Sequence, residues 1–154
     1  MKIAVITGAS AGIGRELVYA IDKEYAYDEI WVIARRRERL DELRAGCRNT
    51  LRPVVLDLGE ESALREYEAL LRQEQPEVAL LVNAAGCGSF GPFAECDLAK
   101  QENSIRLNVL ALTALCRLTL PYMKAGGSII NLGSNSAWQP VPYQAVYGAG
   151  KSYV

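Results

Sequence analysis

Short apolar runs alternate with longer helix-forming segments along this chain of 154 residues. The runs are typical of buried strands, and the segments between them carry hydrophobic residues at helical spacing. Strands are expected at residues 2–7, 29–34, 51–57, 78–84 and 128–132. Helices are expected at residues 12–25, 36–47, 60–74 and 98–124. Such alternation builds βαβ units, so the sequence predicts one α/β domain with a doubly wound parallel sheet that binds ligands at the carboxyl ends of its strands.

Composition narrows the classes of function. Half of the residues are hydrophobic, 23% are charged and the net charge is −1, which is the profile of a soluble globular domain. This balance gives no attraction to nucleic acid or to an anionic membrane surface. No apolar run approaches the roughly 18 residues of a transmembrane helix, and no signal peptide precedes the first strand. We therefore expect a cytoplasmic protein.

The chain has no histidine and four cysteines. Without histidine, Ser-His-Asp and Cys-His mechanisms are excluded and a zinc site is disfavoured. The cysteines form no C-x-x-C pair, so we interpret them as free thiols in a reducing compartment; they are Cys47, Cys87, Cys96 and Cys116. Any acid–base chemistry must then use Tyr, Lys, Asp, Glu or Cys side chains.

A glycine-rich turn joins the first strand to the first helix in the pattern T-G-x-x-x-G-x-G. Glycines there allow positive φ and close backbone approach, and the free N–H groups of the helix start attract a pyrophosphate. The alternative is a tight turn whose glycines serve only helix–strand packing. Its place within one βαβ unit favours a dinucleotide site. The candidate residues are Gly8, Ser10, Gly12, Ile13 and Gly14.

The end of the second strand indicates which dinucleotide would bind. An NAD site usually places Asp or Glu about 20 residues after the glycine turn, but here Ala34 is followed by Arg35, Arg36 and Arg37. A guanidinium can bind the 2′-phosphate of NADP, and no carboxylate is present to repel it. The alternative, a solvated cationic helix start, is opposed by the helix dipole. We predict a preference for NADP(H) over NAD(H), with Arg35 as the first candidate.

Tyr147 and Lys151 are four residues apart, so on a helix they share one face. A neighbouring ammonium favours the phenolate form of a tyrosine, which makes the phenol proton available for carbonyl reduction. The spacing alone is weak evidence, because Tyr19 and Lys23 share it within an ordinary amphipathic helix. The assignment of Tyr147 and Lys151 therefore depends on the motifs that surround them.

Together these motifs resemble the core type of the short-chain dehydrogenase/reductase family along the whole chain. The resemblance implies a Rossmann-like, NADP(H)-binding domain. It implies that Asp57 and its neighbour Leu58 bind the cofactor, with Asp57 at the adenine ring; a simple strand end is the alternative for Asp57. Asn83, Ala84 and Gly86 match the family's N-A-G motif, which steadies the sheet and lines the adenosine ribose site.

The same resemblance implies hydride transfer between the nicotinamide C4 and a small carbonyl or secondary alcohol substrate. Tyr147 would be the acid–base residue, and Lys151 would tune it and hold the nicotinamide ribose. Ser134, which lies thirteen residues before Tyr147, would donate to the carbonyl oxygen; its serine neighbours lack that interval. Asn108 would order the water that returns the proton.

The substrate and the extent of the fold are less constrained. Seven residues of two loops have two interpretations: they form an apolar wall for a substrate, or they belong to the core. These residues are Phe90, Phe93, Trp138, Pro140, Val141, Pro142 and Tyr143. Family members are longer, so we expect the C-terminal substrate-binding part to be absent and the fifth strand to be an open edge. One hypothesis is an oxidoreductase, which in a full-length form would be a homo-oligomer. The other is a non-catalytic nucleotide-binding remnant, or a subunit that needs a partner.

Overall fold

Five parallel strands form one sheet, in the order β3-β2-β1-β4-β5, in the computed structural model, which describes residues 1–154. The strands are β1 (Lys2–Thr7), β2 (Glu29–Ala34), β3 (Leu51–Val55), β4 (Glu77–Asn83) and β5 (Ser128–Asn131). All four neighbouring pairs are parallel, because each strand returns to the same end of the sheet through a crossover on one face or the other. The predicted parallel α/β sheet is confirmed.

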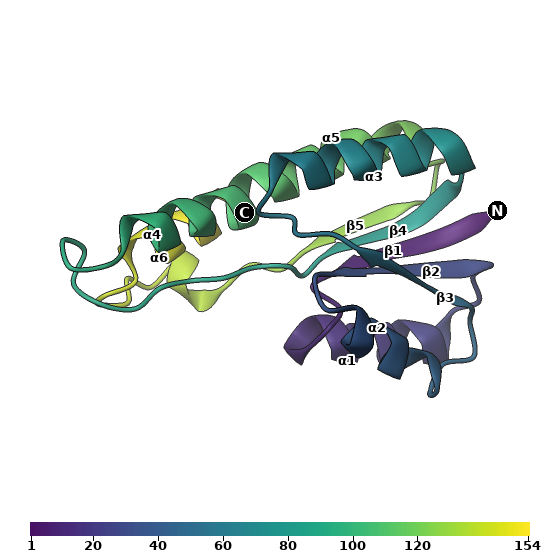
Figure 1. Cartoon of the computed structure of the whole chain (residues 1–154), viewed down its shortest axis with the longest axis horizontal. Coiled ribbons are helices and arrows are strands. Elements are labelled where there is room, and N and C mark those ends of the chain that lie inside the picture. The colour runs from purple at the N-terminus through teal and green to yellow at the C-terminus, as the bar shows by residue number, and fades with distance from the viewer.

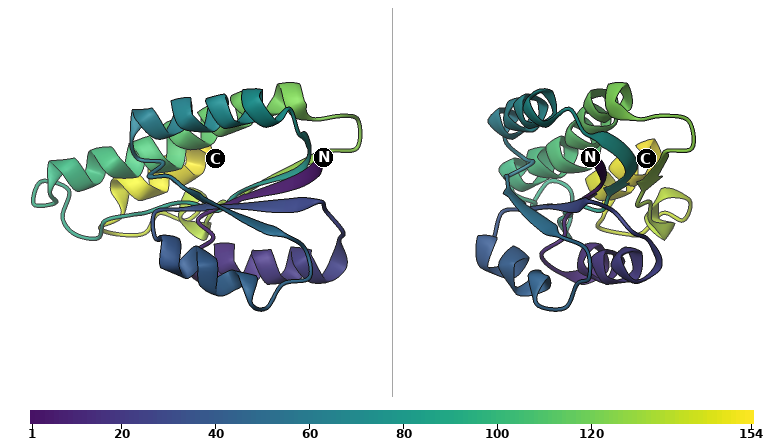
Figure 2. Two further views of the ribbon diagram at one scale, coloured as in Figure 1. Left: turned by 45° about the vertical axis from the view of Figure 1, so that its right-hand side comes forward. Right: turned by 90° about the vertical axis from the view of Figure 1, so that its right-hand side faces the viewer.

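Helices cover both faces of the sheet (Figures 1 and 2). One face carries α1 (Gly12–Glu24) and α2 (Arg37–Arg44). The other carries α3 (Glu61–Glu74), α4 (Leu98–Ile105), the π-helical segment η1 (Arg106–Ala111) and α5 (Leu112–Thr119). Short 3₁₀ turns, η2 (Leu120–Tyr122) and η3 (Asn135–Ala137), flank β5. The last helix, α6 (Ala145–Tyr153), lies beside α4.

Three predicted elements differ from the structure by two or more residues at one end. The helix expected at 98–124 changes to a wider π turn at Arg106–Ala111 and ends in a 3₁₀ turn that contains Pro121, which has no backbone N–H to continue an α-helix. The third strand ends at Val55 rather than 57, because its last sheet partner is Ala34, where β2 itself ends. The helix expected at 36–47 covers only Arg37–Arg44.

Two hydrophobic clusters, one on each face of the sheet, form the core. Successive strand residues enter opposite clusters: Ile3 packs with the first and Ala4 with the second. Trp31 and Tyr67 are the largest fully buried side chains, and burial of such a side chain contributes on the order of 1.5–3 kcal/mol. The Tyr67 hydroxyl lies 2.8 Å from the hydroxyl of Thr119, so its polar atom is satisfied inside the core.

The winding of the chain opens a crevice at the carboxyl ends of β1 and β4. After β1 the chain crosses on the α1 face, and after β4 it crosses on the α4 face (Figure 1). The segments that follow Thr7 and Asn83 therefore separate between two neighbouring strands. Such a switch point is where doubly wound sheets bind ligands.

Strand β5 forms the outer edge of the sheet, as expected. It pairs with β4 through four residue pairs, and none of its own four residues is buried. Its other side faces no strand in the sheet order. None of the helices is both long and apolar enough to cross a membrane.

Candidate active site

The glycine turn after β1 has the backbone that its sequence predicts. Gly8 and Gly12 have φ values of 67° and 56°, in the left-handed region that glycine tolerates best. A methyl group on Gly8 would lie 2.8 Å from the backbone nitrogen of Ala85, and one on Gly14 would lie 2.3 Å from the carbonyl oxygen of Gly8. The backbone of the turn therefore packs directly against the segment after β4 and against the start of α1. At Gly8 and Gly14 a side chain would clash with backbone atoms, so glycine is required there.

Thr7, the last residue of β1, joins the two sides of the crevice. Its fully buried hydroxyl accepts hydrogen bonds from the backbone N–H groups of Ala84 and Ala85, both at 3.0 Å, and donates to the carbonyl of Val82 at 3.3 Å. The glycine turn and the Asn-Ala-Ala-Gly segment are therefore fixed to each other by one side chain. The sequence analysis did not assign Thr7 a role, although the first letter of the T-G-x-x-x-G-x-G pattern was its signal.

One cavity in the crevice gathers the residues expected at the adenosine side. Four of the segments that line it follow strands, namely the glycine turn, the end of β2, the loop after β3 and the segment after β4; Asn103 of α4 and Leu107 of η1 complete the lining. The predicted residues in the lining are Gly8, Ser10, Arg35, Asp57, Leu58, Ala84 and Gly86. All four segments follow the carboxyl ends of strands, so the topology of the sheet brings them together.

Two arginines lie at the rim of this adenosine-side cavity. The guanidinium of Arg36 donates to the hydroxyl of Ser10 at 3.2 Å, and that of Arg35 lies 3.6 Å from a carboxylate oxygen of Asp57. Both guanidinium groups are exposed and retain free N–H donors. The sequence analysis placed Arg35 first, but Arg36 is the one that contacts the glycine turn.

A second cavity shares Ala84, Gly86 and Cys87 with the first and is lined by the predicted catalytic pair. Its walls come from the start of α1, the segment after β4, the end of β5 and α6. The predicted residues in its lining are Ile13, Gly14, Ala84, Gly86, Tyr147 and Lys151. Residues from opposite ends of the sequence thus meet in one cleft.

Tyr147 and Lys151 lie on the same face of α6, as their spacing predicts. The Lys151 ammonium is 5.8 Å from the centre of the Tyr147 ring and donates a 2.7 Å hydrogen bond to the carbonyl of Leu132, just after β5. Lys151 is only 8% exposed, and burial lowers the pKa of its ammonium. The hydrogen bond to Leu132 anchors the Lys151 side chain to the end of the sheet, inside the cleft.

Ser134 lies next to this cavity rather than in its lining, which includes its neighbour Gly133. Its hydroxyl accepts from the backbone N–H of Ser136 at 3.2 Å and so begins the η3 turn. The hydroxyl of Ser136 donates to Gln144 at 3.2 Å. Of the two serines, Ser134 is the one whose hydroxyl hydrogen has no partner in the structure, so it can donate to a ligand.

Asn108 is buried in η1 and holds the segment after β4. Its amide nitrogen donates to the carbonyl of Cys87 at 2.6 Å and to the hydroxyl of Ser104 at 3.0 Å, and its amide oxygen accepts from the Cys87 N–H at 3.2 Å. A methyl group on Gly86 would lie 2.7 Å from that amide oxygen. The side chain of Asn108 thus fixes one wall of the cleft directly.

Asn83 lines neither cavity. Its amide nitrogen donates to the side-chain oxygen of Asn131 at 2.8 Å and to the sulfur of Cys116 at 3.3 Å, so it ties β4 to β5 and α5. Its own amide oxygen is buried without a hydrogen-bond partner. This placement supports the sheet-steadying part of the role that the resemblance implied.

The aromatic residues of the two long loops differ in whether they line the cleft. Phe90 lines the second cavity and packs edge-on against Tyr143, with ring centres 5.5 Å apart. Trp138 is 90% exposed, and neither it nor Phe93 lines the cleft. An apolar wall is therefore present at Phe90, and the core interpretation is wrong for Trp138 and Phe93 because both are largely exposed.

The lining fits a nicotinamide dinucleotide in two respects. A methyl group on Gly12, the first residue of α1, would meet no atom within 4 Å, so the space beside the first N–H groups of this helix is open to a pyrophosphate. The helix start has no acidic residue in its first turn and no side-chain cap, which leaves its positive dipole end uncompensated. An anionic group is the natural complement of this arrangement.

A crevice at the β1–β4 switch point, with a glycine turn on one side and a Tyr–Lys pair on the other, defines a dinucleotide-dependent class of protein. The family model described as short chain dehydrogenase matches residues 2–154. The chain belongs to the short-chain dehydrogenase family.

Known relatives resemble the chain along nearly its full length. Sulfoacetaldehyde reductase 2 of Chromohalobacter salexigens is 35% identical, over 99% of this chain and 62% of its own length. The NADP-dependent 3-hydroxy acid dehydrogenase of Escherichia coli is 34% identical, over 99% and 62%. L-Sorbose reductase from Gluconobacter frateurii, in a crystal structure with NADPH and L-sorbose, superposes with a TM-score of 0.87 at 32% identity, over 98% and 59%. The chain therefore spans about three fifths of the length of these relatives.

Proposed function

We propose that this chain carries the cofactor-binding and catalytic residues of an NADP(H)-dependent oxidoreductase that interconverts a small carbonyl compound and the corresponding alcohol. The observation that carries the proposal is the convergence of Tyr147 and Lys151 with the glycine turn in one cleft. When bound, the nicotinamide would supply or accept the hydride. The protein must supply the proton and hold the reacting carbonyl in place.

Tyr147 is the proton donor for the developing alkoxide. The Lys151 ammonium beside its ring favours the phenolate that remains after proton transfer. The hydrogen bond from Lys151 to the Leu132 carbonyl keeps this charge in the cleft, because it satisfies one of the three ammonium donors away from the tyrosine. The remaining donors are free for a ribose hydroxyl and for solvent.

In this proposal Ser134 and Asn108 support the reaction of Tyr147. The free hydroxyl hydrogen of Ser134 would donate to the substrate carbonyl oxygen and hold it within reach of Tyr147. Asn108 uses its side chain to fix the Cys87 backbone, so its contribution to proton return would come from the π-helical backbone around it. Phe90 would contact an apolar part of the substrate.

NADP(H) is preferred over NAD(H) in this proposal because the two residues that directly follow β2, Arg35 and Arg36, carry guanidinium groups and neither is a carboxylate. Arg36, held by Ser10, and Arg35, held by Asp57, both lie where the adenosine ribose would end. The Escherichia coli relative is NADP-dependent, and the Gluconobacter frateurii structure contains NADPH, which supports the same preference.

A fluorescence titration with NADPH and NADH tests this proposal. We expect NADPH to bind at least about tenfold more tightly, since each charge-assisted contact to the phosphate is worth roughly 1.5–3 kcal/mol. Arg36→Gln should remove most of that difference. Arg39→Gln is the matched control, because Arg39 lies on the same helix, pairs with Glu42 and lines neither cavity. Equal affinity for the two cofactors, or no binding, would contradict the proposal.

One observation favours a second candidate, a nucleotide-binding unit without turnover of its own. The cofactor-side cavity is lined by segments that follow β1, β2, β3 and β4, but the catalytic side is lined by the segment after β5, the edge strand of the sheet. Such a unit would bind NADPH normally but would not oxidise it with any carbonyl compound. Binding and turnover, measured on the same sample, separate the two candidates.

A further inference from the structure

We propose that Gly88 is a positioning residue for Tyr147, whose ring packs directly against the Gly88 backbone. The inference rests on the proposed function and deepens it, because it concerns what sets the place of the phenol in the cleft. Gly88 lies in the segment after β4, and Tyr147 lies in α6. Both residues line the second cavity, so the fold brings them together across the cleft.

The Tyr147 ring fills the space that a side chain at position 88 would need. A methyl group on Gly88 would lie 2.8 Å from Cδ2 of Tyr147, 3.1 Å from Cγ and 3.4 Å from Cβ. Carbon atoms of neighbouring side chains pack at about 3.5–4.0 Å, so the two shorter distances are clashes. The near side of the ring therefore depends on the absence of a side chain at Gly88.

Backbone conformation does not explain the glycine at position 88. The glycines with positive φ are Gly8, Gly12, Gly91 and Gly126. Gly88 is not among them, so an alanine can adopt its backbone. The three heavy atoms nearest to the added methyl group all belong to Tyr147. Contact with the tyrosine is thus the constraint on this position.

The chain that carries Gly88 is held from behind. The side chain of Asn108 binds both the N–H and the carbonyl of Cys87, and the hydroxyl of Ser104 donates to the same carbonyl at 3.0 Å. Asn108 and Ser104 are themselves buried in η1 and α4. Gly88 follows Cys87 directly, so its backbone forms a fixed surface beside the ring.

Helix α6 is held as well. A methyl group on Gly150 would lie 3.6 Å from Cγ2 of Val109, so this helix packs closely against η1, and Lys151 is bonded to Leu132. A side chain at position 88 would therefore displace the tyrosine side chain. Rotation of the ring about its own axis leaves Cγ in place, so the side chain must rotate about its Cα–Cβ bond. The hydroxyl lies at the far end of the ring and moves several times as far as Cγ.

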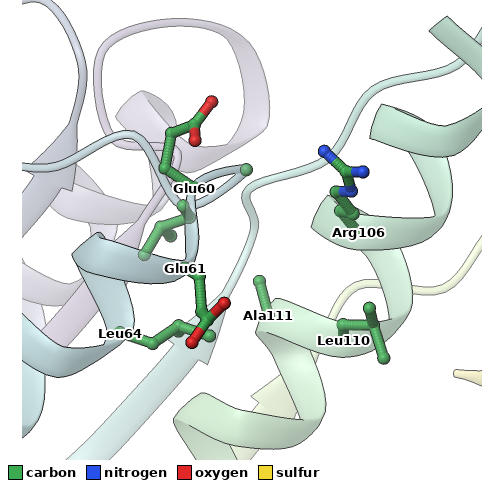
Figure 3. Close-up of a pocket in the computed structure, with 8 residues that line it drawn as sticks. Glu60, Glu61, Leu64, Arg106, Leu110 and Ala111 are labelled. Carbon is green, nitrogen blue, oxygen red and sulfur yellow. The ribbon is translucent and has the colours of Figure 1, made fainter. Parts of the chain in front are cut away.

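Leu110 of η1 offers a comparison site outside the cleft. It lines a hollow between η1 and α3 that shares no residue with the cavity of Tyr147 (Figure 3). The other side chains that Figure 3 labels around this hollow are Glu60, Glu61, Leu64, Arg106 and Ala111. Leu110 is exposed, so Leu110→Ala changes η1 without changing the support of Tyr147.

The test measures carbonyl-dependent NADPH oxidation and NADPH affinity for Gly88→Ala and Gly88→Val in the intact protein. We expect kcat to fall about 10-fold in the alanine variant and about 100-fold in the valine variant, because a shift of the reacting group by about 1 Å can cost about 100-fold. The Kd for NADPH should stay within about threefold of the wild type, since the glycine turn and the arginine rim are unchanged.

Gly46→Ala is the matched control. Gly46 also lacks a positive φ and also lies beside a tyrosine ring, but its methyl group would be 3.6 Å from Cε1 of Tyr19, an ordinary contact distance. Both Gly46→Ala and Leu110→Ala should leave kcat unchanged.

Fluorine NMR of the protein labelled with 3-fluorotyrosine gives a readout that needs no turnover. The resonance that disappears in Tyr147→Phe belongs to Tyr147; it should shift in both Gly88 variants and stay in place in Leu110→Ala. An unmoved resonance or an unchanged kcat in both Gly88 variants, or a loss of kcat that is matched by a loss of NADPH affinity, would overturn the inference and leave the proposed function standing. A wild type that oxidises NADPH with no carbonyl compound would overturn the proposed function, and the positioning role with it.

Discussion

The strands that carry the cofactor side of the crevice, β1 and β2, are far more buried than β5, which leads to the catalytic side. In β1, every residue after Lys2 is buried, and β2 likewise has five buried residues, so the glycine turn and the arginine rim are built on strands enclosed by helices on both faces. In β5 no residue is buried, and the segment that leads from it to α6 is mostly exposed. The cofactor side of the crevice is thus part of the core, whereas the catalytic side is attached to it.

The catalytic side is attached by the pairing of β5 with β4, by the packing of α6 beside α4 and η1, and by a few polar side-chain contacts. Lys151 donates to Leu132, the hydroxyl of Ser152 donates to the Ala137 carbonyl at 2.9 Å, and the hydroxyl of Tyr153 lies 2.7 Å from that of Thr113. We therefore expect substitutions on the two sides of the crevice to have different effects. Changes on the cofactor side should destabilise the fold, and changes in α6 should stop turnover while the fold persists.

The largest effect on stability is expected for Gly14→Ala. The added methyl group would lie 2.3 Å from the Gly8 carbonyl oxygen, and because that neighbour is backbone the turn must distort. We expect a loss of about 1–3 kcal/mol in the free energy of unfolding, together with a loss of NADPH binding. Urea denaturation and a cofactor titration measure the two effects. Gly133→Ala on the catalytic side, where a methyl group meets no atom within 4 Å, should be close to neutral, and equal losses in the two variants would remove the contrast.

Asp22→Asn should show a smaller effect that depends on pH. Burial alone would raise the pKa of the Asp22 carboxyl, but hydrogen bonds from the backbone N–H groups of Arg48 and Asn49 and from the Asn49 amide hold it below its usual value. Because the folded pKa is the lower one, the carboxylate stabilises the fold above its unfolded pKa of about 3.9, and this is lost as the pH falls through the folded value. We expect a loss of about 1–2 kcal/mol near neutral pH, shrinking toward acid, in urea titrations at several pH values. A loss that is the same at pH values on both sides of this window would contradict the account.

Lys151→Met should have the smallest effect on stability, despite its place in the catalytic pair. Burial lowers the pKa of the Lys151 ammonium, so the unfolded chain binds this proton more tightly than the folded one. Wild-type stability should therefore rise as the pH increases from the folded pKa toward the unfolded value of about 10.4, and the variant should lack this rise. At neutral pH the variant should be as stable as the wild type or slightly more so, while turnover is lost. A destabilisation as large as that of Gly14→Ala would show that α6 is part of the core.

The sequence predicted the sheet and the crevice because these depend on local patterns. The apolar runs and the glycine spacing act through backbone conformation and burial, so positions such as Gly8 and Gly14 could be assigned without coordinates. The contacts of Asn108 with the Cys87 backbone could not, because they arise only when η1 packs against the segment after β4. The choice between Arg35 and Arg36 also depended on side-chain direction. Pro121, which lies in the 3₁₀ turn at the end of the helix expected at 98–124, is a signal in the sequence that this helix ends before residue 124.

The central claim is that Tyr147 transfers the proton in a cleft that binds NADPH, and Tyr147→Phe tests it most directly. NADPH affinity and carbonyl-dependent NADPH oxidation would be measured on one sample over a panel of aldehydes and ketones, with Tyr19→Phe, the tyrosine of the other Tyr-x-x-x-Lys pair, as the control. The account predicts that Tyr147→Phe binds NADPH within about twofold of the wild type and loses turnover by at least about 100-fold, while Tyr19→Phe retains both. Turnover retained in Tyr147→Phe, or lost equally in Tyr19→Phe, would contradict it.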